Sequence, residues 1–142
     1  MDLVEAAPEQ TYRLRSEVLG WGSPAISIDG DGAGHLVLVD GAAVVGAVSH
    51  VAWPCPDEPG VPARYFWAMA VDGAYQGRGF GRRLLAAVAD RARAQGERVM
   101  WADARESAVG FYVACGARVT GDPYVDEGTG LPVCHVVFRL DG

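Results

Sequence analysis

The chain has 142 residues and a net charge of −6 at neutral pH, and about half of its residues are apolar. This length and composition indicate one soluble domain over residues 1–142 with a single core. The negative charge disfavours a nucleic-acid partner, and no apolar run approaches the roughly 20 residues that cross a bilayer. The acidic first residues lack the basic and apolar regions of a signal peptide, so we expect a cytoplasmic protein without a membrane partner.

The first elements expected along the chain are a short strand, a helix and a hairpin. Residues 8–19 form the helix, which ends at the glycines around Trp21. Residues 35–39 and 42–51 are apolar runs joined by Asp40-Gly41, the strongest short signal of a hairpin turn. Residues 54–62 are rich in proline and glycine and indicate a surface loop.

The second half alternates between strands and helices. Residues 64–71 form an aromatic-rich strand, and residues 81–95 form the clearest helix, with one apolar stripe and a glycine stop. A strand over 98–102 and a short helix over 107–115 follow. Two strands, 117–125 and 133–140, complete the chain. The full order is strand, helix, three strands, helix, strand, helix, two strands, which is typical of the α/β or α+β class.

Cysteine and histidine spacing gives no sign of a metal site. These residues are widely separated: Cys55, Cys115 and Cys134, with His35, His50 and His135. An odd number of cysteines without a Cys-x-x-Cys pair argues against both a disulfide framework and a zinc site. We therefore expect no metal.

A glycine-rich turn lies between the strand over 64–71 and the long helix. Gly77, Gly79 and Gly81 alternate with other residues, which frees the backbone and leaves room for a ligand. The helix start adds N–H groups and the positive end of its dipole, and Arg78, Arg82 and Arg83 add charge. This arrangement suits a pyrophosphate, although a plain tight turn would have the same sequence.

The sequence of this turn excludes two common phosphate-binding motifs. A P-loop needs Gly-Lys-Ser/Thr, and the chain contains no lysine. The dinucleotide fingerprint needs G-x-G-x-x-G, whereas Gly77, Gly79 and Gly81 give G-x-G-x-G.

The turn resembles the acetyl-CoA motif of the GNAT acyltransferase superfamily, Q/R-x-x-G-x-G/A. It reads Gln76-Gly77-Arg78-Gly79-Phe80-Gly81 and follows a strand that ends in Met69-Ala70-Val71. Residues 101–112, with Phe111-Tyr112 at their end and Cys115-Gly116 beyond, are similar to the family's later motif. Arg105 replaces the asparagine frequent in that motif, and Ala117 replaces a phenylalanine. Within the superfamily, the chain resembles small bacterial acyltransferases.

The resemblance implies the fold and the donor site. The expected fold is a mixed, mostly antiparallel sheet with a central splayed parallel strand pair, flanked by helices. The backbone of the strand would bind the pantetheine arm, with the N–H of Ala70 or Val71 facing the thioester oxygen. The cofactor-binding residues implied are Met69, Ala70, Val71, Gln76, Gly77, Arg78, Gly79, Phe80, Gly81 and Arg82.

The resemblance also implies a catalytic acid. Tyr112 would donate a proton to the leaving thiolate, and its alternative role is packing, as for Phe111. The proton acceptor for the amine stays open between Asp103, Glu106, His135 and water.

The implied function is N-acetyl transfer from acetyl-CoA to a primary amine of a small molecule by direct attack. A protein amino group as acceptor, and a non-catalytic module that binds CoA or a partner, are the alternatives. The acceptor would lie near residues 15–21 and 124–131. The acidic residues Asp122, Asp126 and Glu127 would favour a cationic amine, or are simply solvated. A homodimer is left open.

Overall fold

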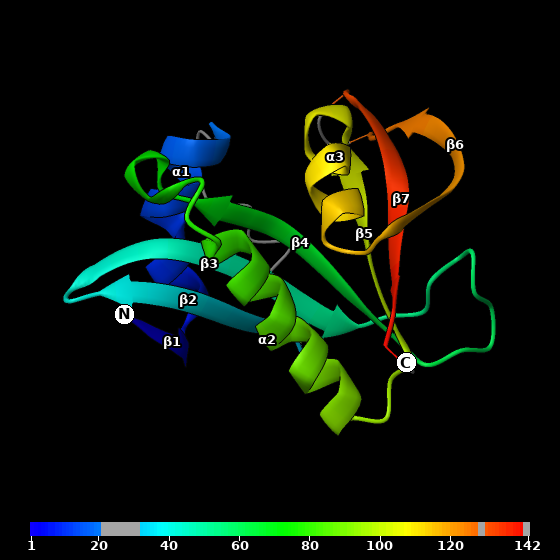
Figure 1. The fold of residues 1–142 in the computed structure, drawn as a ribbon, viewed down its shortest axis with the longest axis horizontal. Coiled ribbons are helices and arrows are strands. Elements are labelled where there is room, and N and C mark those ends of the chain that lie inside the picture. Colours follow the sequence, from blue (N-terminus) through cyan, green and yellow to red (C-terminus); the bar gives the residue numbers. More distant parts are fainter. Residues whose placement is uncertain (21–31, 128–129, 141–142) are drawn as a thin grey trace. The chain divides into compact units, whose positions relative to one another are not determined.

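The computed structural model describes residues 1–20, 32–127 and 130–140 (Figure 1). Within them, seven strands form a sheet of order β1-β2-β3-β4-β5-β7-β6. The strands are β1 (Asp2–Glu5), β2 (Gly34–Asp40), β3 (Ala43–Ala52), β4 (Ala63–Val71), β5 (Val99–Arg105), β6 (Arg118–Val125) and β7 (Pro132–Arg139). The helices are α1 (Tyr12–Leu19), α2 (Phe80–Ala94) and α3 (Glu106–Ala114), with the short 3-10 helices η1 (Pro8–Thr11) and η3 (Gly73–Tyr75).

The sheet is mixed, as the sequence predicts. β4 and β5 are parallel, and the registers of β1–β2, β2–β3, β5–β7 and β6–β7 are antiparallel. The parallel register joins Ala63, Arg64 and Tyr65 to Val99, Met100 and Trp101. This α+β architecture, with one parallel pair in a mostly antiparallel sheet, confirms the expected fold class.

The chain divides into two compact units. The first unit contains Met1–Val51 and Phe66–Asp90, and the second contains Ala52–Tyr65 and Arg91–Gly142. Strand β4 and helix α2 each run from one unit into the other.

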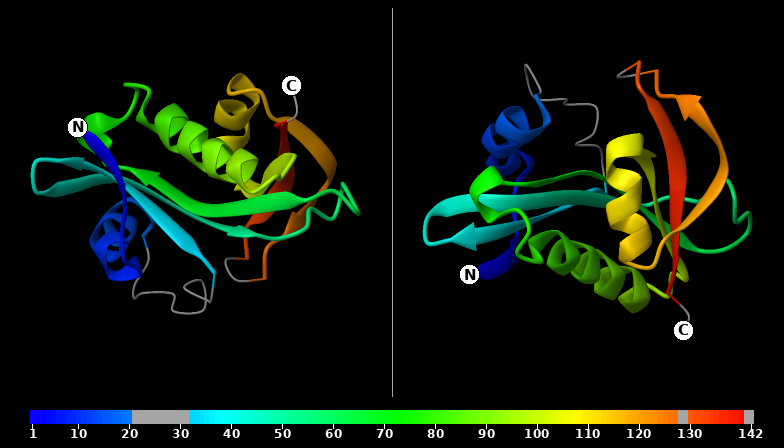
Figure 2. Two further views of the ribbon diagram at one scale, coloured as in Figure 1. Left: turned by 90° about the horizontal axis from the view of Figure 1, so that it is seen from below. Right: turned by 45° about the horizontal axis from the view of Figure 1, so that its top comes forward.

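In the first unit, α1 and α2 cover opposite faces of the strands (Figure 2). The uninterrupted run of apolar residues along β2 explains this. Val37 packs with Leu14 of α1 in one cluster, whereas Leu38 approaches the same point of β3 as Leu84 of α2, at Gly46. Because successive side chains of a strand point to opposite faces, both faces of β2 are apolar and each carries a helix.

In the second unit, α3 packs against β5 and β7 (Figure 1). The ring of Tyr112 meets that of Phe138 with centroids 6.3 Å apart. A buried ion pair adds to this core: Arg64 donates to Glu97 from Nε at 2.6 Å and from Nη2 at 3.0 Å, and both side chains are less than a tenth exposed.

Most predicted elements are present, with small differences at their ends. The helix predicted over 8–19 opens as the 3-10 helix η1 before α1 begins, and Gly20 ends it with φ +73°. The hairpin loop is Gly41-Ala42 rather than Asp40-Gly41, because Asp40 still pairs with Ala43. β5 continues to Arg105, three residues beyond its predicted end, because those residues remain paired with β7.

None of the helices in residues 1–20, 32–127 and 130–140 combines the length and the apolar character needed to span a membrane.

Candidate functional site

Strand β4 has an unusual backbone conformation just before the residues predicted to bind the donor. Ala68 has φ +52°, and it is the one non-glycine residue with a positive φ in the described part of the chain. This conformation is unfavourable for a residue with a Cβ and interrupts the regular strand. Met69, Ala70 and Val71 follow it and lead into the glycine-rich turn. The irregularity therefore lies directly before the segment that the sequence predicts to bind the donor.

The turn after β4 is fixed by hydrogen bonds at its base. The Asp72 N–H donates to the Val45 carbonyl at 2.8 Å, and the Asp72 carboxylate accepts from the Ala74 N–H at 2.9 Å. The Gln76 side-chain amide donates to the Val71 carbonyl at 2.9 Å. Gln76 thus ties the turn to the last residue of β4, which is a structural reason for the residue type at this position.

Two glycines of the turn, Gly77 and Gly79, have left-handed backbone conformations. Gly77 has φ +77° and Gly79 has φ +85°, and nothing lies within 4 Å of a Cβ built at either position. The Arg83 N–H donates to the Gly79 carbonyl at 3.1 Å, so the N–H groups of Phe80 and Gly81 come before the first N–H that has an acceptor within the helix. Open space, left-handed glycines and helix-terminal N–H groups together fit a pyrophosphate.

Charge around the turn comes from arginines on exposed positions. The Arg78 guanidinium lies 5.6 Å from the centre of the Tyr75 ring, which is itself held by a hydrogen bond from its hydroxyl to Asp40 at 2.6 Å. Arg82 is exposed. Arg83 donates instead to the Met1 carbonyl, from both terminal nitrogens at 3.3 Å. Arg78 and Arg82 thus place positive charge near the turn, whereas the Arg83 guanidinium is hydrogen-bonded to the Met1 carbonyl.

Tyr112 lies in the second unit and is 8% exposed. Its ring packs against those of Phe111 and Phe138, at centroid distances of 5.4 and 6.3 Å. Burial raises the pKa of Tyr112 to about 12. Phe111 is 38% exposed, so the two neighbouring aromatic residues face different surroundings, as helix spacing predicts. At neutral pH the Tyr112 phenol is a protonated hydrogen-bond donor.

A polar cluster in the second unit brings together residues that are far apart in sequence. The imidazole of His135 lies between two carboxylates, with Nδ1 2.5 Å from Asp57 Oδ2 and Nε2 3.3 Å from Asp103 Oδ1. Tyr65 donates its hydroxyl hydrogen to Asp103 at 3.0 Å, and Tyr124 donates to the same carboxylate. Burial, with the nearby Asp103 charge, raises the pKa of both tyrosines. We call this the Asp57–Asp103–His135 cluster.

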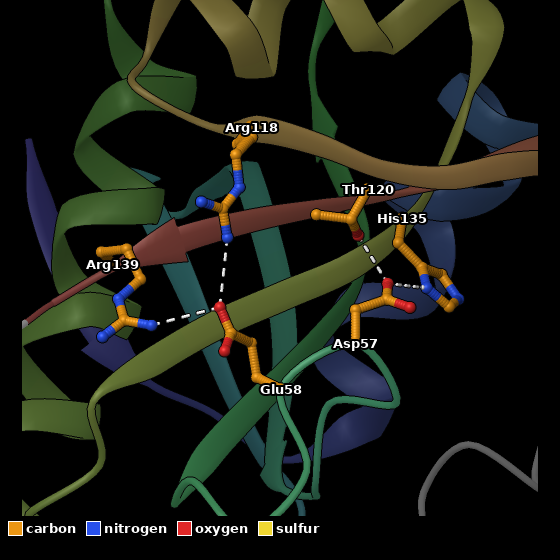
Figure 3. A network of polar contacts seen from close by, with 6 residues as sticks. All are labelled: Asp57, Glu58, Arg118, Thr120, His135 and Arg139. Carbon is orange, nitrogen blue, oxygen red and sulfur yellow. Dashed lines mark hydrogen bonds and ion pairs between the residues drawn. The ribbon is translucent and has the colours of Figure 1, made fainter.

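The loop between β3 and β4 is bound to β6 and β7 through its two acidic residues (Figure 3). Asp57 accepts from the Thr120 hydroxyl at 2.5 Å, and Glu58 Oε1 accepts from Arg118 and Arg139 at 3.1 Å each. The hydrogen bond from Thr120, together with His135, lowers the pKa of Asp57. The sequence indicated only a surface loop here.

Sequence reasoning therefore missed Asp57. The available signal was a pair of carboxylates beside Cys55 in a proline-rich loop, and the structure buries that cysteine to 1% exposure. The sequence does not show which strands lie beneath the loop, so it predicts no hydrogen-bonding partner for these carboxylates.

The remaining candidates have simpler surroundings. Glu106 is exposed in the first turn of α3, where a carboxylate complements the helix dipole. On the predicted acceptor side, Arg15 is 0% exposed, while Trp21 and residues 128–129 lie outside the described residues. Asp122 and Glu127 are exposed and Asp126 is half-buried. The described residues contain no group of three or more His, Cys, Asp or Glu side chains that could hold a metal ion.

Comparisons with solved structures show the same fold over almost the whole chain. A candidate N-acetyltransferase from Lactobacillus plantarum is 25% identical, with a TM-score of 0.77 over 98% of this chain and 97% of that one. FeeM, an N-acyl amino acid synthase from uncultured soil microbes, is 14% identical, with a TM-score of 0.80 over 99% and 95%. An aminoglycoside 6'-N-acetyltransferase complexed with coenzyme A is 14% identical, with a TM-score of 0.78 over 100% and 98%.

A search of curated proteins gave no match. The model of the acetyltransferase (GNAT) family matches residues 3–117, which include the β4 segment, the glycine-rich turn and α3. The chain therefore belongs to the acetyltransferase (GNAT) family.

Proposed function

We propose that the protein transfers an acetyl group from acetyl-CoA to a primary amine of a small molecule by direct attack, as one catalytic domain over residues 1–142. The observation that carries this proposal is the pair of left-handed glycines, Gly77 and Gly79, at the start of α2 with open space beside them. GNAT proteins are generally acyl-CoA-dependent, and the fold is shared with a structure that contains coenzyme A.

The donor would be held mainly by backbone groups of the first unit. The turn and the first N–H groups of α2 would bind the pyrophosphate, and the end of β4 would pair with the pantetheine arm. The proposed binding residues are Met69, Ala70, Val71, Gln76, Gly77, Arg78, Gly79, Phe80, Gly81 and Arg82. Bound acetyl-CoA supplies a thioester, which an amine can attack at its carbonyl carbon.

Tyr112 would act on the departing sulfur as a hydrogen-bond donor. Its pKa of about 12 exceeds that of an ordinary thiol, near 8.5, so complete transfer of the phenolic proton to a thiolate is uphill. A hydrogen bond from a neutral phenol to a developing anion is still favourable. We therefore assign Tyr112 to stabilising the thiolate, with the thiol proton supplied afterwards from solvent.

The attacking amine must be neutral and must lose a proton after attack. Asp103 accepts hydrogen bonds from Tyr65 and Tyr124 and lies 3.3 Å from His135, so its oxygens already have partners within the cluster. The Glu106 carboxylate lies in the first turn of α3, where it interacts favourably with the helix dipole. Both ring nitrogens of His135 face carboxylates, Asp57 and Asp103, so these contacts favour a water molecule as the proton acceptor.

Thermal melting with and without excess acetyl-CoA tests the proposal. A ligand at about 100 times its Kd adds about 2.7 kcal/mol to the free energy of unfolding, which raises Tm by several degrees for a chain of this size. No shift at millimolar acetyl-CoA would refute the donor assignment. Release of the CoA thiol is then measured with a panel of cationic and neutral small amines and with a peptide amine. The amines that are acetylated separate transfer to a small molecule from transfer to a peptide, and a non-catalytic binding module would release no thiol with any of them.

A further inference from the structure

Arg15 of α1 is a buried cation in the first unit. It is 0% exposed, and its guanidinium donates from Nε to the Ala68 carbonyl at 3.1 Å. The two terminal nitrogens donate to the Thr11 hydroxyl at 2.9 Å and to the Ser49 hydroxyl at 2.6 Å. Removing a guanidinium from water is costly, so a buried arginine indicates that its contacts serve a purpose beyond packing.

The Ala68 carbonyl belongs to the strained residue of β4. A left-handed conformation is unfavourable for alanine, and it persists only where neighbouring contacts hold it. Two elements supply that hold, because Arg15 on α1 is itself fixed by Ser49 on β3. The Ser49 hydroxyl also lies 2.7 Å from His35 Nδ1, so a continuous polar chain supports the guanidinium.

Fixing this carbonyl also fixes the peptide that follows it. The C=O and N–H of a trans peptide point in opposite directions, and the described chain has no cis peptide bond. With the Ala68 carbonyl directed to Arg15, the Met69 N–H is directed away from α1. Met69 is the first of the three residues through which β4 would bind the donor.

We propose that Arg15 is a positioning residue for the acyl donor: it holds Ala68 in its left-handed conformation and thereby orients the Met69 N–H toward the pantetheine or thioester part of acetyl-CoA. The inference rests on the proposed acetyl-CoA site. It differs from the sequence-based expectation, which assigned the thioester contact to Ala70 or Val71.

The test uses two ligands that divide the donor into parts. Adenosine 3′,5′-bisphosphate reaches only the phosphate-binding turn, whereas acetyl-CoA also needs β4. By titration calorimetry, Arg15→Met should weaken acetyl-CoA binding about tenfold, the loss expected for one hydrogen bond, and leave adenosine 3′,5′-bisphosphate within about threefold. Arg13→Met is the matched control, because Arg13 lies on the same helix and its side chain is 90% exposed.

A second substitution separates positioning from general support of the fold. Glycine adopts the left-handed conformation without strain, so Ala68→Gly in the Arg15→Met background should restore at least part of the acetyl-CoA affinity. The coupling constant between the amide and α hydrogens of Ala68, which reports φ, should change in Arg15→Met and stay unchanged in Arg13→Met. Arg15→Lys, which keeps the charge but loses the planar fork, should show the same direction of effect if Arg15→Met does not fold.

The outcomes distinguish this inference from the proposed function. Absence of acetyl-CoA binding by the unsubstituted protein overturns the function. Normal binding by that protein, with unchanged acetyl-CoA affinity in folded Arg15→Met or Arg15→Lys, overturns the role of Arg15 alone. An equal loss for both ligands, or no recovery with Ala68→Gly, also overturns it, because Arg15 would then support the unit as a whole.

Discussion

The glycine-rich turn of the first unit and the Asp57–Asp103–His135 cluster of the second unit are built from different parts of the chain. The turn is local: β4, the two left-handed glycines and the start of α2 are consecutive in sequence, and its proposed ligand groups are backbone N–H groups. The cluster draws its side chains from a loop, from β5 and from β7, and it acts through carboxylates and an imidazole.

This difference determines which substitutions should matter in each region. A site made of backbone groups depends on φ and on open space, so an added side chain at a glycine is more harmful than truncation of a neighbour. A site made of side chains depends on every hydrogen-bonding partner. Loss of one partner leaves the buried polar group of the other without a hydrogen bond, which is unfavourable.

Arg64→Met tests how far the second unit depends on paired side chains. The substitution leaves the buried Glu97 carboxylate without the guanidinium that binds it through two hydrogen bonds. We expect a loss of about 3–5 kcal/mol in the free energy of unfolding, measured by urea titration. The double variant Arg64→Met/Glu97→Leu should be more stable than Arg64→Met, because it removes the orphaned charge as well.

Arg118→Met is the control for this prediction. Arg118 also pairs with a glutamate, Glu58, but its side chain is 62% exposed. We expect a cost of about 1 kcal/mol or less. Equal costs for Arg64→Met and Arg118→Met would mean that burial of the pair has no bearing on stability.

Gly79→Val tests the backbone site. Gly79 has φ +85°, which a β-branched residue strongly disfavours, and the new side chain would enter the space proposed for phosphate oxygens. Acetyl-CoA affinity should fall at least about 100-fold, equivalent to about 2.7 kcal/mol, as measured by calorimetry. Gly60→Val is the matched control, because Gly60 has φ +79° and open space around it but lies in the loop of the second unit. Retained affinity in Gly79→Val would show that the pyrophosphate binds elsewhere.

Much of the fold and of the turn could be predicted from the sequence because their signals are local. The apolar stripe that contains Leu84 and Val88 predicts α2, and both residues are fully buried. The alternating glycines predict a turn with room for a ligand, and Gly77 and Gly79 have open space beside them. Ala68 could not be predicted, since nothing about an alanine indicates a left-handed residue, and its conformation depends on tertiary contacts with Arg15.

The cluster in the second unit was beyond sequence reasoning for a related physical reason. Asp57 and His135 are 78 residues apart, and their contact exists only because the loop lies over β7. A carboxylate in a proline-rich loop is ordinarily solvated, so composition favours the wrong environment for Asp57. Such contacts between distant segments leave no periodicity or spacing in the sequence.

Tyr112→Phe tests the one proposed catalytic side chain. The ring and its packing against Phe138 are retained, and only the hydroxyl is lost. A hydrogen bond to a charged group contributes about 1.5–3 kcal/mol, so kcat should fall about 10- to 100-fold while acetyl-CoA affinity stays nearly constant. Phe111→Leu, at the exposed neighbour, should leave kcat within a few-fold. An unchanged kcat in Tyr112→Phe would remove the phenol from the mechanism.

Asp57→Asn should have the smallest effect on the free energy of unfolding, and this effect should depend on pH. Hydrogen bonding from Thr120, with His135 beside it, lowers the pKa of Asp57 below its usual value of 3.8 in the folded chain. A lowered folded-state pKa stabilises the fold above pH 3.8, and this stabilisation is lost as the pH falls through the lower folded value. Because the carboxylate is 27% exposed, its contribution is about 1 kcal/mol or less. Asp57→Asn should therefore be slightly less stable than the unsubstituted protein near neutral pH, and the difference in free energy of unfolding, measured by urea titration, should shrink below pH 3.8.

A difference in free energy of unfolding that is constant from neutral to acid pH would show that the amide disturbs packing rather than charge. In that case packing rather than charge would hold the loop. Only the Arg64–Glu97 pair would then support the contrast between the side-chain contacts of the second unit and the backbone groups of the turn.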